Sequence, residues 1–175
     1  MISRFLSVVD SVSKIAGGVA AVMLIGIAAL ILTEIIMRVA LNLSLDFAWE
    51  YSTYFTAIVI FCGAAYTLRT GGHVRVSLLS TSVPPRAAYA IDILCTLIAV
   101  ALVALLAYAM TEMVLGSLIA GSKSPTIVAT PLVVPQGGVA AGAIVLLLQL
   151  IARLVRLFTG QPPEDSSGQA SYRVD

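Results

Sequence analysis

The stretch that decides the fold is ILCTLIAVALVALLAYAMT, residues 93–111, which holds no charged residue. An α-helix needs about 20 predominantly apolar residues to cross the hydrocarbon core of a bilayer, so this stretch is long enough to span a membrane. Three more stretches of comparable length are also free of charge: Ile15–Thr33, Tyr51–Leu68 and Ser124–Ala152. The sequence therefore predicts an all-α integral membrane protein with four transmembrane helices.

The composition supports a membrane protein and argues against a nucleic-acid partner. Hydrophobic residues make up 59% of the chain and charged residues only 11%, whereas soluble domains carry roughly 25% charged residues. The formal net charge is +1, and no basic helix with interleaved aromatic residues occurs, so the electrostatic signature of a nucleic-acid-binding protein is missing.

The helix boundaries follow from where charges, prolines and glycines interrupt the apolar runs. We expect one four-helix membrane domain over residues 15–158, with spans at about 15–37, 47–68, 88–115 and 137–158. The uncharged part of the first span is longer than the apolar core of a cleaved signal peptide, so we expect this helix to be retained. Residues 159–175 are rich in Gly, Pro, Ser and acid, which predicts a disordered tail.

Two segments outside the spans have patterns of their own. Residues 1–14 repeat apolar side chains every three to four positions, which predicts a short amphipathic helix on the membrane surface. The apolar residues are Ile2, Phe5, Leu6, Val9 and Val12. Between the third and fourth spans, Pro125, Pro131 and Pro135 break regular helix and predict an extended or re-entrant connector.

The distribution of Lys and Arg predicts the orientation, because these residues accumulate in cytoplasmic loops. One side of the predicted bundle collects eight of them: Arg4, Lys14, Arg69, Arg75, Arg86, Arg153, Arg156 and Arg173. The other side has only Arg38 and Lys123. We therefore expect both termini, including the tail, in the cytoplasm.

The sequence offers no set of residues for a cofactor or for catalysis. Cys62 and Cys95 lie inside predicted spans without metal-binding spacing, and His73 is the only histidine, so neither a haem with two histidine ligands nor a zinc site is expected. No nucleophile has a plausible base nearby. We expect no cofactor and no enzymatic activity.

Glu34 is the one acid inside the first predicted span. It stands four residues before Arg38, a favourable order for an ion pair on a helix, and we interpret Glu34 and Arg38 as a structural ion pair. The alternative is a self-sufficient, homodimeric, proton-coupled exporter that uses Glu34 as its coupling carboxylate.

The start of the second span combines acids and aromatic residues. Asp46 and Glu50 suit the first turn of a helix, where carboxylates are stabilised by the helix dipole. Trp49, Tyr51 and Tyr54 fit an interfacial aromatic belt. We nevertheless retain Trp49, Glu50 and Tyr54 as candidates for contact with another protein subunit.

The loop after the second span is basic. Gly71-Gly72 ends the helix, and Arg69, His73 and Arg75 either bind lipid phosphates or a partner's carboxylates, or simply follow the charge rule for cytoplasmic loops. Asp92 is interpreted as a marker of a span end. In the fourth span, Gly138 and Gly142 have the spacing that lets two membrane helices approach closely.

From Asp46 to Leu79 the sequence resembles the small membrane subunit, of DctQ type, of tripartite ATP-independent periplasmic (TRAP) transporters. The resemblance consists of an acid-containing aromatic patch, a Gly-Ala-Ala-Tyr stretch and a Gly-His-hydrophobic-Arg-Val loop. The matching residues are Glu50 and Tyr54, Gly63-Ala64-Ala65-Tyr66, Arg69, Gly72-His73-Val74-Arg75-Val76 and Leu78-Leu79, followed later by Thr130-Pro131, Pro135 and Gly137.

This resemblance implies a chain that binds no substrate itself. It implies a static scaffold beside a large permease subunit in the bacterial inner membrane, with a periplasmic solute-binding protein delivering an organic acid and a cation gradient driving uptake. Besides the exporter, a membrane anchor of a redox complex is a third, weaker hypothesis, because the chain has too few histidines for a haem-bearing version.

Overall fold

The computed structural model describes residues 2–71 and 84–162. These residues form four long helices: α1 (Ile2–Leu41), α2 (Asp46–Arg69), α4 (Pro85–Ala120) and α5 (Val133–Thr159). Each is long and apolar enough to cross a membrane. The prediction of an all-α protein with four membrane-spanning helices is confirmed.

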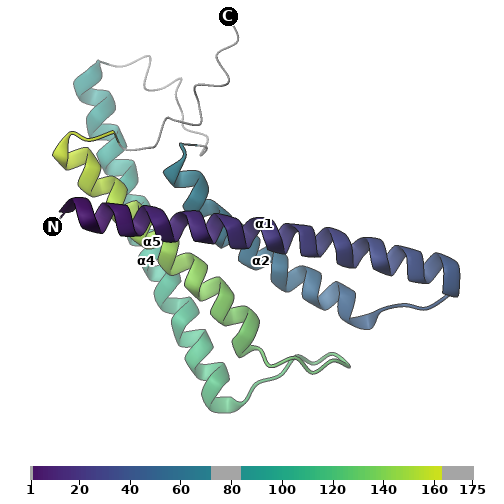
Figure 1. Ribbon diagram of the computed structural model, residues 1–175. Helices are drawn as coiled ribbons and strands as arrows, with labels where there is room; N and C mark the ends of the chain where they lie inside the picture. Colours follow the sequence, from purple (N-terminus) through teal and green to yellow (C-terminus); the bar gives the residue numbers. More distant parts are fainter. Residues whose placement is uncertain (1, 72–83, 163–175) are drawn as a thin grey trace, which may run out of the picture.

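The helices form two antiparallel pairs that diverge from each other (Figure 1). α1 and α2 are one pair and α4 and α5 the other, and α5 packs against both α1 and α2. Within the described residues, α4 makes its helix contacts only with α5. The start of α1 and the end of α5 lie at the same end of the molecule, as expected for termini on one side of a membrane. Which side that is stays a prediction.

α1 is a single helix of 40 residues rather than a surface helix followed by a span. At 1.5 Å per residue it is about 60 Å long, roughly twice the thickness of the hydrocarbon core. The predicted amphipathic segment is its first third, and its apolar side is not wholly free for lipid: Leu6 and Val9 are buried against Ala152 of α5. A position of this segment on the membrane surface therefore remains a prediction.

Two other helices are longer than predicted. α4 exceeds the expected span 88–115 at both ends, and α5 begins at Val133 instead of Gly137. The prediction that Pro135 precedes the last helix was wrong, because Pro135 lies in its first turn, where backbone N–H groups have no partner within the helix and proline is tolerated. α2 agrees with the predicted span 47–68 within one residue at each end.

The predicted extended connector is present as a short hairpin. Lys123 and Pro131 form an isolated antiparallel bridge. The N–H of Ser124 donates to the carbonyl of Thr130 at 2.8 Å, and the N–H of Leu132 donates to the carbonyl of Ser122 at 3.0 Å. This hairpin, residues 121–132, projects from the α4–α5 pair (Figure 1).

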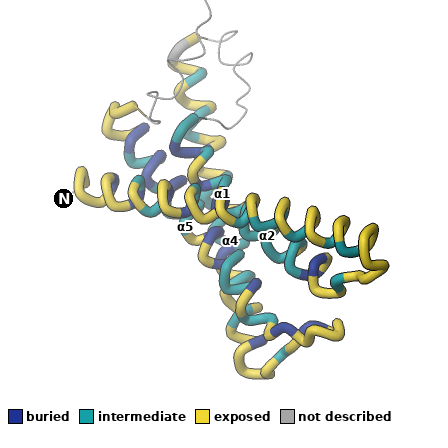
Figure 2. The backbone as a smooth tube through the Cα atoms, turned by 45° about the vertical axis from the view of Figure 1, so that its right-hand side comes forward, coloured by how far each residue is buried: buried dark blue, intermediate teal, exposed yellow. Residues whose placement is uncertain are grey.

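Small residues make up the core where α5 crosses α1 and α2. Ala65, Ala143 and Ala152 are fully buried, and Figure 2 shows that burial is concentrated in this crossing region while much of α1 is exposed. A Cβ at Gly142 would lie 2.8 Å from Cβ of Phe61, so α5 and α2 touch through this glycine. The close approach predicted from the glycine spacing thus occurs at α2.

Replacement of Gly142 by Ala should lower the free energy of unfolding by about 1–3 kcal/mol, because the added methyl group overpacks the α2–α5 contact. Gly137 provides the matched control, since a Cβ there meets no atom within 4 Å and alanine is the better helix residue. Unfolding of both variants in detergent, followed by circular dichroism, measures the difference. Equal stability of G142A and G137A would contradict the close contact.

Candidate interaction and anchoring sites

A buried charge cluster joins α1, α2 and α5. Nη2 of Arg156 lies 2.7 Å from both carboxylate oxygens of Asp10, and Nε of Arg69 lies 3.5 Å from one of them. The side chains of both arginines are only 9% exposed. We call Asp10, Arg69 and Arg156 the three-helix cluster. One carboxylate on α1 therefore holds guanidinium groups from two other helices.

A second ion pair extends this network to α4. Nη2 of Arg153 on α5 lies 2.7 Å from Asp92 on α4, and the hydroxyl of Tyr89 donates to the carbonyl of Leu157 at 2.8 Å. The interpretation of Asp92 as a mere marker of a span end was therefore incomplete, because Asp92 pairs across helices.

A buried hydrogen bond lies deeper in the same region. The hydroxyl of Ser13 donates to Oε1 of Gln149 at 2.9 Å, and both side chains are almost fully buried. The sequence did not predict a structural role for Gln149, because this residue lies inside an uncharged stretch. A signal was nevertheless available: Gln149, Arg153 and Arg156 follow one another at spacings of four and three, which places them on one face of a helix.

At the opposite end of α1, Glu34 has several partners. Its carboxylate forms an ion pair with Arg38 and accepts a hydrogen bond from the hydroxyl of Ser44 at 3.0 Å and one from the backbone N–H of Leu45 at 2.6 Å. Leu45 is the residue that precedes α2. Glu34 therefore fastens the turn between α1 and α2, a structural task that differs from that of a free coupling carboxylate.

If this is the role of Glu34, the E34Q variant should loosen the α1–α2 turn and leave transport by a complete transporter partly intact. The amide oxygen still accepts one hydrogen bond, whereas the charge that attracts Arg38 is lost. Hydrogen exchange of the Leu45 N–H measures the first effect, and substrate uptake measures the second. Abolished transport with normal assembly would contradict this role.

Glu50 connects α2 to the hairpin between α4 and α5. It is 6% exposed, accepts a hydrogen bond from the hydroxyl of Tyr54 at 2.8 Å, and accepts another from the hydroxyl of Thr126 at the hairpin. The structure thus brings Glu50 and Tyr54 together, as two of the predicted site residues, and adds Thr126 as a partner that sequence reasoning missed.

The other predicted site residues do not join Glu50 and Tyr54. Trp49 is 85% exposed, and Arg69 lies in the three-helix cluster at the other end of α2. His73 and Arg75 fall outside the described residues, as does residue 163 onward of the predicted tail. The six candidates therefore do not form a single site in the part of the chain that the structure describes.

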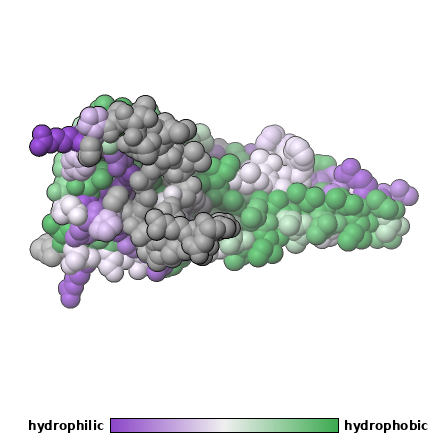
Figure 3. Space-filling view, turned by 90° about the horizontal axis from the view of Figure 1, so that it is seen from above, coloured by the Kyte–Doolittle hydropathy of each residue, from purple (hydrophilic) through white to green (hydrophobic). Residues whose placement is uncertain are grey.

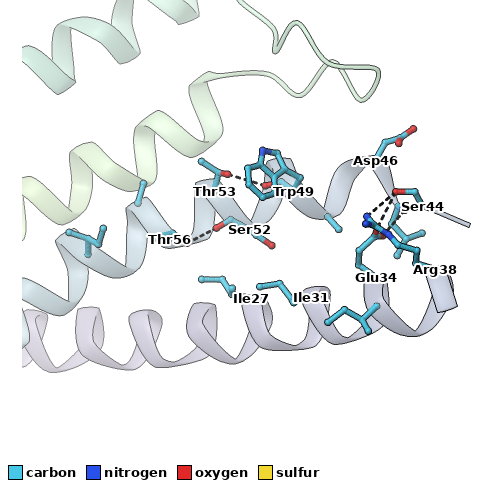
Figure 4. A pocket seen from close by; sticks show the side chains of 15 residues that line it. Ile27, Ile31, Glu34, Arg38, Ser44, Asp46, Trp49, Ser52, Thr53 and Thr56 are labelled. Atoms are coloured by element: carbon cyan, nitrogen blue, oxygen red, sulfur yellow. Dashed lines mark hydrogen bonds and ion pairs between the residues drawn. The ribbon is translucent and has the colours of Figure 1, made fainter.

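A groove of about 860 Å³ runs between α1 and α2 near their connecting turn. Figure 4 shows Ile27 and Ile31 of α1 facing Ser52 of α2 across it, with the Glu34–Arg38 pair at its end. Trp49, Thr53 and Thr56 also line the groove. Its lining is mostly apolar with a few hydroxyl groups, as in packing surfaces between membrane helices.

Large apolar side chains cover the outside of the molecule. On α1, Val22 and Ile25 are 66% and 70% exposed, and on α4, Leu102 and Leu105 are 62% and 65% exposed. Figure 3 shows a broad hydrophobic surface along the α1–α2 pair with hydrophilic residues at its ends. Such a surface requires lipid or another membrane protein around it.

Together, the four apolar helices and the placement of charges at their ends define a multi-pass membrane protein. In the described residues, no group of three or more His, Cys, Asp or Glu side chains is arranged to hold a metal ion.

Comparison with protein families assigns this membrane protein to a transporter family. The family model for tripartite ATP-independent periplasmic transporters, DctQ component, matches residues 27–160. The chain belongs to this family, which confirms the resemblance noted from the sequence. A comparison with curated proteins finds no match. The family is a component of a transporter, and the groove, Glu50, Arg69 and both ion-paired arginines of α5 lie within the matched residues.

Proposed function

We propose that this chain is the small membrane subunit that scaffolds the large permease of a TRAP transporter. The large subunit moves the substrate, an organic acid, at the expense of a cation gradient, and a periplasmic solute-binding protein delivers it. The complex resides in the bacterial inner membrane, with both termini of this chain in the cytoplasm. Membership of the DctQ family supports a place in a TRAP transporter, and the distribution of Lys and Arg supports the cytoplasmic termini.

The scaffold role is supported by what three acids of the described helices bind. Each of them contacts another part of this chain and so holds the protein together. Asp10 and Asp92 pair with arginines of α5, and Glu50 binds the hairpin. A transport pathway needs polar groups that face a passage for solute. Here the polar groups fix helices and turns, which fits a support rather than a carrier.

The face that meets the permease should be apolar and rigid. α4 packs on α5 alone among the described helices, so most of its surface is free, and the groove with the exposed Trp49 offers a second surface. Exposed aromatic side chains are frequent anchors of protein interfaces. We propose interface or membrane-anchoring roles for Trp49, Glu50, Tyr54, Arg69, His73 and Arg75, and a structural role for the Glu34–Arg38 pair.

Co-purification tests the assignment. The tagged chain, expressed together with a large TRAP permease subunit and extracted in mild detergent, should retain the permease in a fixed ratio. A W49A variant with normal folding should retain less permease if Trp49 lies in the interface. Y108A, which removes an aromatic residue that is 65% exposed on α4, tests the α4 face in the same way. Recovery of a functional chain without any large membrane partner would refute the scaffold role.

A further inference from the structure

A second hollow lies at the end of the molecule opposite the α1–α2 turn. It has a volume of about 360 Å³ and shares no lining residue with the groove. α1, α2 and α5 all contribute to its lining, together with the segment that follows α5. Its polar lining includes Ser7, Asp10, Lys14, Arg69, Arg156 and Gln161. The hollow therefore opens beside the three-helix cluster.

The ionisable residues that line this hollow carry an excess of positive charge. Three are basic and one is acidic, which gives a formal charge of +2 (three minus one). Both oxygens of the single carboxylate, Asp10, are bound by Arg156. Lys14 is exposed and has no ion pair or hydrogen bond with any residue in the ranges 2–71 and 84–162. Its ammonium group is thus available to an anion.

The hollow lies at the level where the uncharged parts of the helices end. The uncharged stretch of α1 begins at Ile15, directly after Lys14, and that of α2 ends at Leu68, directly before Arg69. In a bilayer this boundary coincides with the lipid headgroups. Basic pockets between membrane helices at this level bind anionic headgroups.

We propose that the hollow binds one phosphate-bearing anion, with Lys14 as the charged group that pairs with it. Ser7 and Lys14 are two helical turns apart on α1 and line the same hollow, so a hydroxyl donor and an ammonium group approach one ligand from a single helix. The arginines supply positive potential without leaving Asp10. The bilayer supplies such a ligand as the headgroup of an anionic phospholipid, and inorganic phosphate presents the same chemistry from solution.

Native mass spectrometry of the purified full chain tests the lipid source. Phosphatidylglycerol and phosphatidylcholine are added at equal concentration, and the wild-type chain should retain phosphatidylglycerol preferentially. The K14Q variant should bind phosphatidylglycerol about fivefold more weakly, since one basic residue near the membrane surface contributes roughly this factor. The matched control is R4Q, because Arg4 is an exposed base on the same helix outside the hollow. R4Q should bind like the wild type.

A second arm tests free phosphate. If inorganic phosphate raises the melting temperature relative to chloride at equal ionic strength, and K14Q removes that effect, the hollow is a site for soluble phosphate compounds. The proposal fails if wild type, K14Q and R4Q retain phosphatidylglycerol equally and phosphate has no effect. Should K14Q not fold, the wild-type measurements still decide, because no preference for phosphatidylglycerol over phosphatidylcholine and no response to phosphate would overturn the site.

Discussion

The D10N substitution should lower the free energy of unfolding by about 3–5 kcal/mol. This is the largest loss of stability that we expect for a single polar substitution in this chain. Asp10 is the one carboxylate of the three-helix cluster, and its removal leaves the buried guanidinium of Arg156 without its carboxylate and beside the like charge of Arg69. Removing one partner of a buried ion pair has a cost of this size because the remaining charge stays desolvated. Unfolding in mixed detergent, followed by circular dichroism, measures the loss.

The D46N variant is the matched control. Asp46 is exposed in the first turn of α2, where its charge contributes only about 0.3–1 kcal/mol through the helix dipole. The same chemical change should therefore have a several-fold smaller effect than at Asp10. Similar stabilities of D10N and D46N would show that the three-helix cluster does not hold α1 to α5.

The E50A variant should release the hairpin between α4 and α5 from α2. Both hydrogen bonds to the Glu50 carboxylate disappear: the hydroxyl of Tyr54 loses its acceptor, and the hydroxyl of Thr126 keeps only the hydroxyl of Ser124, 3.1 Å away. A hydrogen bond to a charged group contributes about 1.5–3 kcal/mol, and values near the lower end apply here because Tyr54 is half-buried and Thr126 is exposed. For the two bonds together we expect a loss of about 3–4 kcal/mol. Hydrogen exchange of the hairpin N–H groups of Ser124 and Leu132 measures the local opening.

The E112A variant controls for the loss of a glutamate. Glu112 is exposed on α4, so its removal should leave both stability and hairpin exchange close to those of the wild type. The T126V variant tests the hairpin side of the contact and should reproduce part of the E50A effect. Unchanged hairpin exchange in both E50A and T126V would contradict a connection between the hairpin and α2 through Glu50.

Local sequence signals predicted the helices well. The number of spans, the limits of α2 and the Glu34–Arg38 pair all depend on residues within a few positions of each other, which periodicity and charge reveal. The start of α5 was misjudged because a proline stops a helix only beyond its first turn. The prediction divided α1 at Lys14, where the charges end. The helix continues through this point because no proline near Lys14 interrupts it.

Local sequence signals could not predict the contacts between helices. Asp10 and Arg156 are 146 positions apart, and Glu50 and Thr126 are 76 positions apart. A charge count assigned Arg153 and Arg156 to the cytoplasmic side without revealing that they pair with acids on other helices. Knowledge of which helices pack together was required, and that packing depends on small residues such as Gly142 whose partners the sequence does not specify.

The central claim is that this chain supports a permease and transports no solute alone. Transport in proteoliposomes tests this claim most directly. Vesicles are prepared with this chain, with the large permease, and with both, and the solute-binding protein is added outside under a cation gradient. The account predicts substrate uptake only where both subunits are present and none with this chain alone. Proton-coupled flux in vesicles that contain only this chain, lost in the E34Q variant, would contradict it.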